Sequence, residues 1–210
     1  MNMANAPFRE REIYMLTIRP ACHYDADAIW RIFHAVVSTG DTYAYDPDTS
    51  RDEALSIWMG PKGFTYVAEE DERIVGTYLL KANQPGLGAH VANAGFMVDP
   101  ETQARGIGRA MGEHCLAEAR RLDFRAMQFN LVVSTNEHAV ALWQKLGFEI
   151  VGRLPSAFHH RQLGYVDAYV MYRSLLGDND ILDARAEDNS REVTRVRSQK
   201  VNNQFPDAEL

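Results

Sequence analysis

The chain has 210 residues, of which 46% are hydrophobic and 24% are charged, and these fractions are typical of a folded globular protein. Its 22 Lys and Arg residues against 29 Asp and Glu residues give a formal net charge of −7, which disfavours nucleic acid as a partner. Two widely separated cysteines, a charged N-terminus and the lack of a long apolar segment predict a cytoplasmic protein with no metal site and no membrane partner.

The first part of the chain predicts a strand, two helices and a hairpin. Leu16–Arg19 has the composition of a short strand, and apolar residues recur at helical spacing between Ile29 and Val37. A second short helix is expected around Trp58. Two β-rich segments, Phe64–Glu69 and Arg73–Lys81, flank an acidic turn and predict a hairpin.

The second part alternates between strands and helices. A strand over His90–Val98, a long helix, a strand, a helix ending at Gly147 and two short final strands are expected. The stretch His159-His160-Arg161 between the final strands is expected to be a solvated loop. Residues beyond 177 are polar and predict disorder. The organisation expected is an N-terminal extension (1–14), one domain (15–176) and a tail (177–210).

Two glycines at the start of the long helix predict an anion site. They allow the backbone to turn with its N–H groups exposed, and a helix N-terminus attracts negative charge. Arg105 and Arg109 add full positive charges, so a pyrophosphate is the expected ligand. Ordinary loop chemistry after Asp-Pro is the alternative for this segment alone. The residues expected to bind the pyrophosphate are Gln103, Ala104, Arg105, Gly106, Ile107, Gly108 and Arg109.

This segment, Q-A-R-G-I-G, resembles the acetyl-CoA pyrophosphate loop of the GNAT superfamily of N-acetyltransferases, Gln/Arg-x-x-Gly-x-Gly/Ala. A second block, N-E-H-A-V-A-L-W-Q-K-L-G-F at 136–148, is similar to the family pattern N-x-x-A-x-x-L-Y-x-x-x-G-F. The resemblance implies an α/β GNAT fold, a mixed central sheet with splayed parallel strands flanked by helices. It also implies acetyl-CoA as co-substrate.

The same resemblance implies roles for particular residues near the splayed strands. The backbone of Met97 or Val98 would pair with the pantetheine of acetyl-CoA and donate an N–H to the thioester oxygen. Asn136 resembles the family asparagine whose amide reaches CoA, and an N-cap role for it is compatible with that contact. Trp143 stands where many members have a tyrosine that protonates the thiolate, so either Tyr165, Tyr169 or solvent would take that role.

A closer resemblance concerns the acceptor. The patterns N-x-x-F-M-V and F-N-L-V on the two splayed strands are similar to those of the fungal proline-analogue (L-azetidine-2-carboxylate) N-acetyltransferases. In that subgroup, asparagines on these strands hold the small substrate. The resemblance implies that Asn93, Asn130 and Leu131 contact the substrate, with Asn93 and Asn130 as the catalytic candidates. The alternative is that each asparagine only satisfies a splayed backbone.

These features predict direct acetyl transfer from acetyl-CoA to the nitrogen of a small amino acid or cyclic amino-acid analogue. No covalent enzyme intermediate is expected, because neither cysteine falls on the predicted cleft strands. A homodimer is compatible with the resemblance. Two alternatives remain open, namely a protein or peptide N-acetyltransferase and a non-catalytic CoA-binding module.

Overall fold

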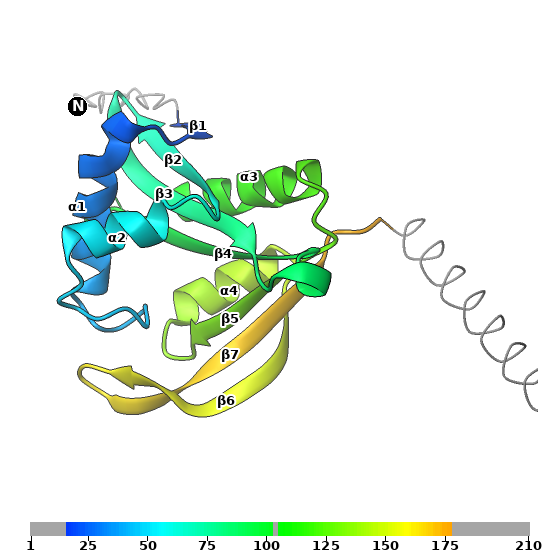
Figure 1. Cartoon of the computed structure of the whole chain (residues 1–210). Coiled ribbons are helices and arrows are strands. Elements are labelled where there is room, and N and C mark those ends of the chain that lie inside the picture. Colours follow the sequence, from blue (N-terminus) through cyan, green and yellow to red (C-terminus); the bar gives the residue numbers. More distant parts are fainter. Residues whose placement is uncertain (1–15, 103–104, 178–210) are drawn as a thin grey trace, which may run out of the picture. The chain divides into compact units, whose positions relative to one another are not determined.

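The computed structural model describes residues 16–102 and 105–177, which contain a mixed seven-stranded sheet in the order β1-β2-β3-β4-β5-β7-β6 (Figure 1). The chain divides after Arg173 into two units, and the first holds the helices and all but the last residue of the sheet. The strands are β1 (Leu16–Pro20), β2 (Phe64–Glu70), β3 (Arg73–Ala82), β4 (Val91–Val98), β5 (Ala126–Val133), β6 (Glu149–His160) and β7 (Gly164–Ser174). The helices are α1 (Ala26–Val37), α2 (Arg51–Trp58), α3 (Ile107–Arg121) and α4 (Glu137–Lys145).

Local signals account for the helix boundaries. Ser50 begins α2 with a capping box, because its side chain accepts from the backbone N–H of Glu53 while the Glu53 carboxylate accepts from the Ser50 N–H. Gly147 follows α4 with a φ of +80°, the left-handed conformation that ends many helices. The predicted α/β fold with flanking helices is confirmed. None of the helices in the described ranges is long and apolar enough to cross a membrane.

The prediction of a loop was wrong for His159 and His160, because β6 and β7 are long strands that form one hairpin and include both histidines, whereas Arg161 lies in the turn between them. Pro155 hid the strand from sequence analysis, since proline interrupts a regular ladder. The strand accommodates it with a register shift between Leu154 and Phe158. His160 is buried, and its Nδ1 accepts from two backbone N–H groups of the turn.

The two faces of the sheet are covered by different helices. Leu79 and Met97 pack with α1 and α2 in one apolar cluster. Neighbouring residues on β3 point the other way, since strand side chains alternate between faces. A Cβ at Gly76 would lie only 2.9 Å from the Cε of Met111, which shows how closely α3 approaches this second face. α1 and α2 therefore cover one face of β3 and β4, and α3 covers the other (Figure 1).

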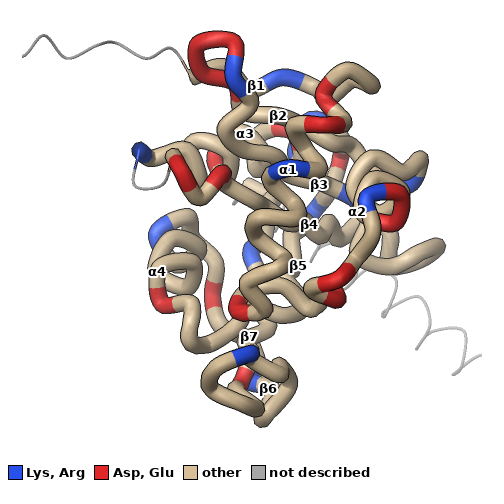
Figure 2. Tube along the Cα trace, turned by 90° about the vertical axis from the view of Figure 1, so that its left-hand side faces the viewer, with Lys and Arg blue, Asp and Glu red and all other residues tan. Residues whose placement is uncertain are grey.

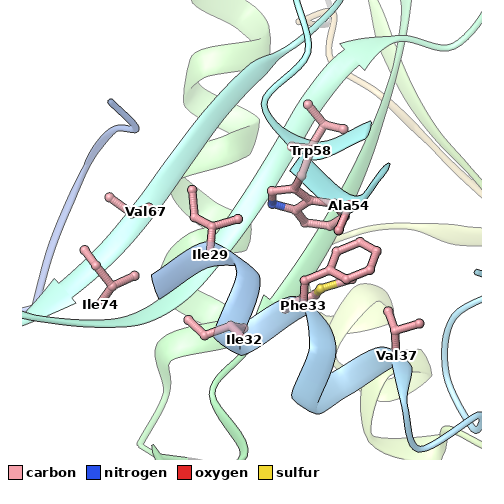
Figure 3. Close-up of a cluster of buried hydrophobic side chains, with 10 residues drawn as sticks. Ile29, Ile32, Phe33, Val37, Ala54, Trp58, Val67 and Ile74 are labelled. Atoms are coloured by element: carbon pink, nitrogen blue, oxygen red, sulfur yellow. The ribbon is translucent and has the colours of Figure 1, made fainter. Parts of the chain in front are cut away.

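The cluster under α1 and α2 is the apolar core of that face (Figure 3). Trp58 is 1% exposed, and its indole N–H donates to the Thr77 hydroxyl at 3.0 Å, so its polar atom is satisfied inside the core. The buried members are Ile29, Ile32, Phe33, Val37, Ala54, Trp58, Val67, Ile74, Leu79 and Met97.

Strands β4 and β5 are parallel and separate soon after they begin. Their ladder pairs Val91 with Ala126 and Ala92 with Met127. At the next position the Asn93 amide donates to the carbonyl of Gln128 at 2.9 Å, so a side chain bridges the two strands where backbone pairing ends. The predicted splay of the central parallel strands is present, and it opens a gap in the middle of the sheet.

Acid is expected to weaken the fold through Asp25, whose carboxylate accepts from Nη1 and Nη2 of Arg19 at 2.8 and 2.9 Å. These hydrogen bonds lower the pKa of Asp25 to about 2. Because the folded-state pKa is below the ordinary value of about 3.9, this stabilisation is complete above that value and is lost as pH falls toward 2. Asp25→Asn should therefore lower the urea midpoint at pH 6 and lose less stability than the wild type between pH 5 and 2.5. Asp48→Asn, which removes an exposed carboxylate, should match the wild type at every pH.

Candidate active site

The gap between β4 and β5 contains a cavity of about 320 Å³. Its walls come from both strands, from β3, from α2 and α4, and from the segment between α1 and α2. The residues that line it are Thr42, Tyr43, Ala44, Tyr45, Trp58, Leu79, Lys81, Asn93, Ala94, Gly95, Phe96, Phe129, Asn130, Leu131, Val132, Val133, Asn136, Ala139 and Trp143.

Aromatic side chains form the walls on both sides of the sheet. On the α4 side, the Trp143 ring centroid lies 4.8 Å from those of Phe96 and Phe129. On the α2 side, Tyr43 packs edge to face on Trp58 at 6.2 Å. Burial raises the pKa of Tyr43, so its hydroxyl stays protonated at neutral pH. The cavity thus has aromatic walls, and its polar side chains are mainly amides and tyrosine hydroxyls.

Backbone groups of β4 alternate between β3 and the cavity. Directly after the strand, the Asp99 N–H donates to the Val75 carbonyl at 2.9 Å, so odd-numbered residues face β3. The Tyr43 hydroxyl donates to the Phe96 carbonyl at 2.7 Å, which places an even-numbered carbonyl on the cavity side. The gap in the sheet therefore has one row of β4 backbone groups along it.

This alternation distinguishes the two backbone N–H groups, those of Met97 and Val98, that the sequence offered as donors to the thioester oxygen. Met97 pairs with Thr77 in the β3–β4 ladder and has the same parity as Asp99. Val98 has the parity of Phe96, so its N–H projects toward the gap. Neither Met97 nor Val98 belongs to the cavity lining, which ends at Phe96 on this strand, but by this alternation the Val98 N–H faces away from β3 and the Met97 N–H faces toward it.

The amide side chains meet across the cavity on the side away from α4. The Asn130 amide nitrogen donates to Oδ1 of Asn83 at 2.7 Å, and its own Oδ1 accepts from Nε2 of Gln128 at 2.8 Å. Asn93 bonds the Gln128 carbonyl as described above, so the structure brings Asn93 and Asn130 to one cavity. Leu131, the other predicted substrate contact, also lines it.

The N-terminus of α3 has the features of an anion site. Gly106 precedes the helix with φ +80°, a Cβ placed on it would meet nothing within 4 Å, and no side chain of the described residues caps the helix. At Gly108 a Cβ would make only ordinary contacts, 3.6 Å from Leu142 and 3.8 Å from Val98. The first N–H groups of a helix have no partner within it. Open space beside these groups fits a phosphate group that approaches the backbone closely.

The two arginines predicted at this site are held by acids. Arg105 Nη1 lies 2.9 Å from the Glu70 carboxylate, and Arg109 Nε lies 2.8 Å from that of Glu113. Both cations are therefore positioned near the helix start but share their charge with carboxylates. Gln103 and Ala104 lie outside the described residues, whereas Ile107, the first residue of α3, is buried.

The remaining residues that the sequence singled out differ in whether they line the cavity. Asn136 caps α4, since its Oδ1 accepts from the Ala139 N–H at 3.1 Å, and it also lines the cavity. Tyr165 is 72% exposed on β7, and neither Tyr165 nor Tyr169 belongs to the cavity lining. Trp143, the departure from the family pattern, forms a cavity wall.

Lys81 was not predicted at this site, and for Tyr43 the sequence left open either a substrate contact or aromatic packing. The contact between Tyr43 and Phe96 joins residues 53 positions apart, so no local pattern could reveal it. For Lys81 a signal existed: pairing the predicted hairpin with the next strand in register places Lys81 opposite Asn93.

Proteins of known structure or activity resemble this chain in fold and in sequence. A sequence profile of the Acetyltransferase (GNAT) family matches residues 27–148. N-acetyltransferase aca1 of Schizosaccharomyces pombe is 30% identical over 151 residues, which are 64% of this chain and 72% of aca1. A GCN5-related N-acetyltransferase from Kribbella flavida is 47% identical, with a TM-score of 0.73, over 76% of this chain and 97% of its own. The Salmonella typhimurium protein yncA, solved with its cofactor acetyl-CoA, has 23% identity and a TM-score of 0.70 over 78% of this chain and 95% of its own.

Proposed function

Because this chain belongs to the GNAT family of N-acetyltransferases, we propose that it transfers an acetyl group from acetyl-CoA to the nitrogen of a small amino acid or cyclic amino-acid analogue. The observation that carries the proposal is the cavity in the splayed sheet. A volume of about 320 Å³ suits the reacting ends of two small groups. Its lining combines aromatic walls with side-chain amides, which bind polar groups without carrying charge.

The donor would lie between the N-terminus of α3 and the gap between β4 and β5. The backbone at Gly106 and Gly108 would hold its pyrophosphate, and Val98 would offer an N–H along the gap. Acetyl-CoA supplies an acyl group on a thioester. An N–H that points at the thioester oxygen stabilises the charge that develops there during acyl transfer.

The acceptor would occupy the part of the cavity bounded by Asn93, Asn130 and Tyr43. Among the described lining residues there is no carboxylate, imidazole or thiol. Cys115 is fully buried on α3, and burial raises the pKa of its thiol. This supports direct transfer to the amine, with proton release to solvent, rather than a covalent acyl-enzyme.

The test is thiol release from acetyl-CoA with a panel of proline, azetidine-2-carboxylate, other amino acids, polyamines and short peptides. We expect turnover of small amino acids, with kcat/KM reduced about 10-fold or more in Asn130→Ala, because the acceptor loses an amide partner worth roughly 1–2 kcal/mol. The control Gln84→Ala removes an exposed amide outside the cavity and should behave as the wild type.

Two results would contradict the proposal. Turnover restricted to peptides would identify a peptide N-acetyltransferase. No turnover with any amine, together with a rise in melting temperature on adding acetyl-CoA, would indicate a CoA-binding module without catalysis.

A further inference from the structure

The described lining of the cavity carries a single formal charge. Lys81 is the only ionisable residue other than the two tyrosines among the described residues that line it. Along the described trace, basic and acidic positions are spread over many different elements (Figure 2). A lysine beside a largely apolar cavity is expected to attract an anion, because the described lining holds no opposite charge to partner it.

Lys81 stands on the acceptor side of the cavity. It is the direct cross-strand partner of Asn93 in the β3–β4 ladder, so their side chains project from the same face of the sheet. It also has the parity of Leu79, which packs toward α1 and α2. Trp143, on α4, lies on the opposite side of the gap, beside the phenyl rings of Phe96 and Phe129.

No carboxylate engages this lysine within the described part of the chain. Salt bridges elsewhere involve arginines, for example Arg31 and Arg73 on Asp99. Lys81 takes part in no ion pair or hydrogen bond of this kind, and it is half-buried at the end of β3. Its ammonium is therefore available to a ligand, and its three donors can meet a carboxylate together with the neighbouring amides.

We propose that Lys81 binds the carboxylate of the acetyl acceptor and thereby restricts the enzyme to amines that carry one. This inference rests on the proposed function and specifies its substrate class. In an α-amino acid the nitrogen and the carboxyl group are attached to the same carbon. A carboxylate held at Lys81 therefore keeps the nitrogen within the same small compartment, next to Asn93 and the β4 backbone.

The same charge argues against the other amine classes. A polyamine or a lysine side chain would bring a second cation into a cavity whose described lining contains no acid. Two like charges a few ångströms apart in a partly desolvated site repel each other by several kcal/mol. Lys81 would thus act both by attracting amino acids and by excluding cationic amines.

The experiment compares acids with their uncharged counterparts. Wild type, Lys81→Met and Lys81→Arg are assayed with proline and azetidine-2-carboxylate, and with prolinamide and azetidine-2-carboxamide. The ratio of kcat/KM for acid to kcat/KM for amide should fall about 10- to 100-fold in Lys81→Met, the range expected for a hydrogen bond to a charged group, and recover partly in Lys81→Arg. Lys62→Met, which removes an exposed lysine outside the cavity, should keep the wild-type ratio.

A second readout does not depend on acetylation of the probe. Cyclopentanecarboxylate has the anion but no nitrogen, so it should inhibit the wild type competitively against the acceptor and inhibit Lys81→Met far less. An unchanged acid-to-amide ratio in Lys81→Met, with amino acids still acetylated, would overturn the role of Lys81 and leave the proposed function intact. Turnover of peptides or polyamines alone would overturn both.

Discussion

Gly108→Asp is expected to abolish acetyl-CoA binding while the apo-protein becomes slightly more stable. Gly108 is the second residue of α3, and a Cβ there would make only ordinary contacts, so the backbone tolerates a residue with a Cβ. An acidic residue in the first turn of a helix is favourable by about 0.3–1 kcal/mol, and replacing a helical glycine adds to this. The same carboxylate would occupy the site proposed for the pyrophosphate and repel the negative charge of that group.

The measurement is the shift in melting temperature on adding acetyl-CoA, followed by KM for acetyl-CoA. We expect the wild type to be stabilised by the ligand and Gly108→Asp to show no shift, with an affinity loss of 100-fold or more. Gly108→Ala should lie between them. Ala117→Asp, which adds the same charge on the exposed side of α3, is the matched control. If Gly108→Asp bound acetyl-CoA as the wild type does, the pyrophosphate site would have to lie elsewhere.

Trp58→Ala should cause the largest loss of stability of any variant considered. Its side chain is buried between α1, α2 and the sheet, packs at 5.8 Å on Phe33, and donates to Thr77. Truncation leaves a large void and removes the indole N–H from the Thr77 hydroxyl, which keeps its own bond to the Tyr66 carbonyl at 2.9 Å. Loss of a buried tryptophan side chain costs about 3–5 kcal/mol, most of it from the void. Because domains of this size are stable by only about 5–15 kcal/mol, the variant should unfold at much lower urea concentration.

The variant also tests how the core supports the cavity. Trp58 lines the cavity beside Tyr43, so its loss should raise the acceptor KM more than the acetyl-CoA KM under conditions where the variant is folded. Trp30→Ala, at a partly buried tryptophan of α1 outside the cavity, is the comparison and should cost less. Equal losses of stability for both variants would contradict the central place assigned to Trp58 in this core.

Several features of this protein were set by local sequence. Gly106 and Gly108 at the start of α3 carry a helix-start signal, and the segment from Asn136 to Gly147 carries both a start and an end signal. The structure has helices at both places. Hydrophobic spacing placed β2, β3, β4 and β5 with boundaries close to those observed. Such signals act over one or two turns, so the sequence alone was sufficient to predict these elements and the family resemblance that follows from their motifs.

Tertiary structure decided the contents of the cavity. Tyr43 reaches Phe96 over 53 residues, and the Arg161 N–H donates to the Gly40 carbonyl at 3.0 Å, joining the β6–β7 hairpin to the segment that carries Tyr43. The short β4–β5 ladder then determines where the sheet opens. Lys81 becomes a cavity residue only because β3 pairs with β4 in a register that sets it opposite Asn93. Pairing between distant segments depends on the packing of the whole domain, and local propensity carries no information about it.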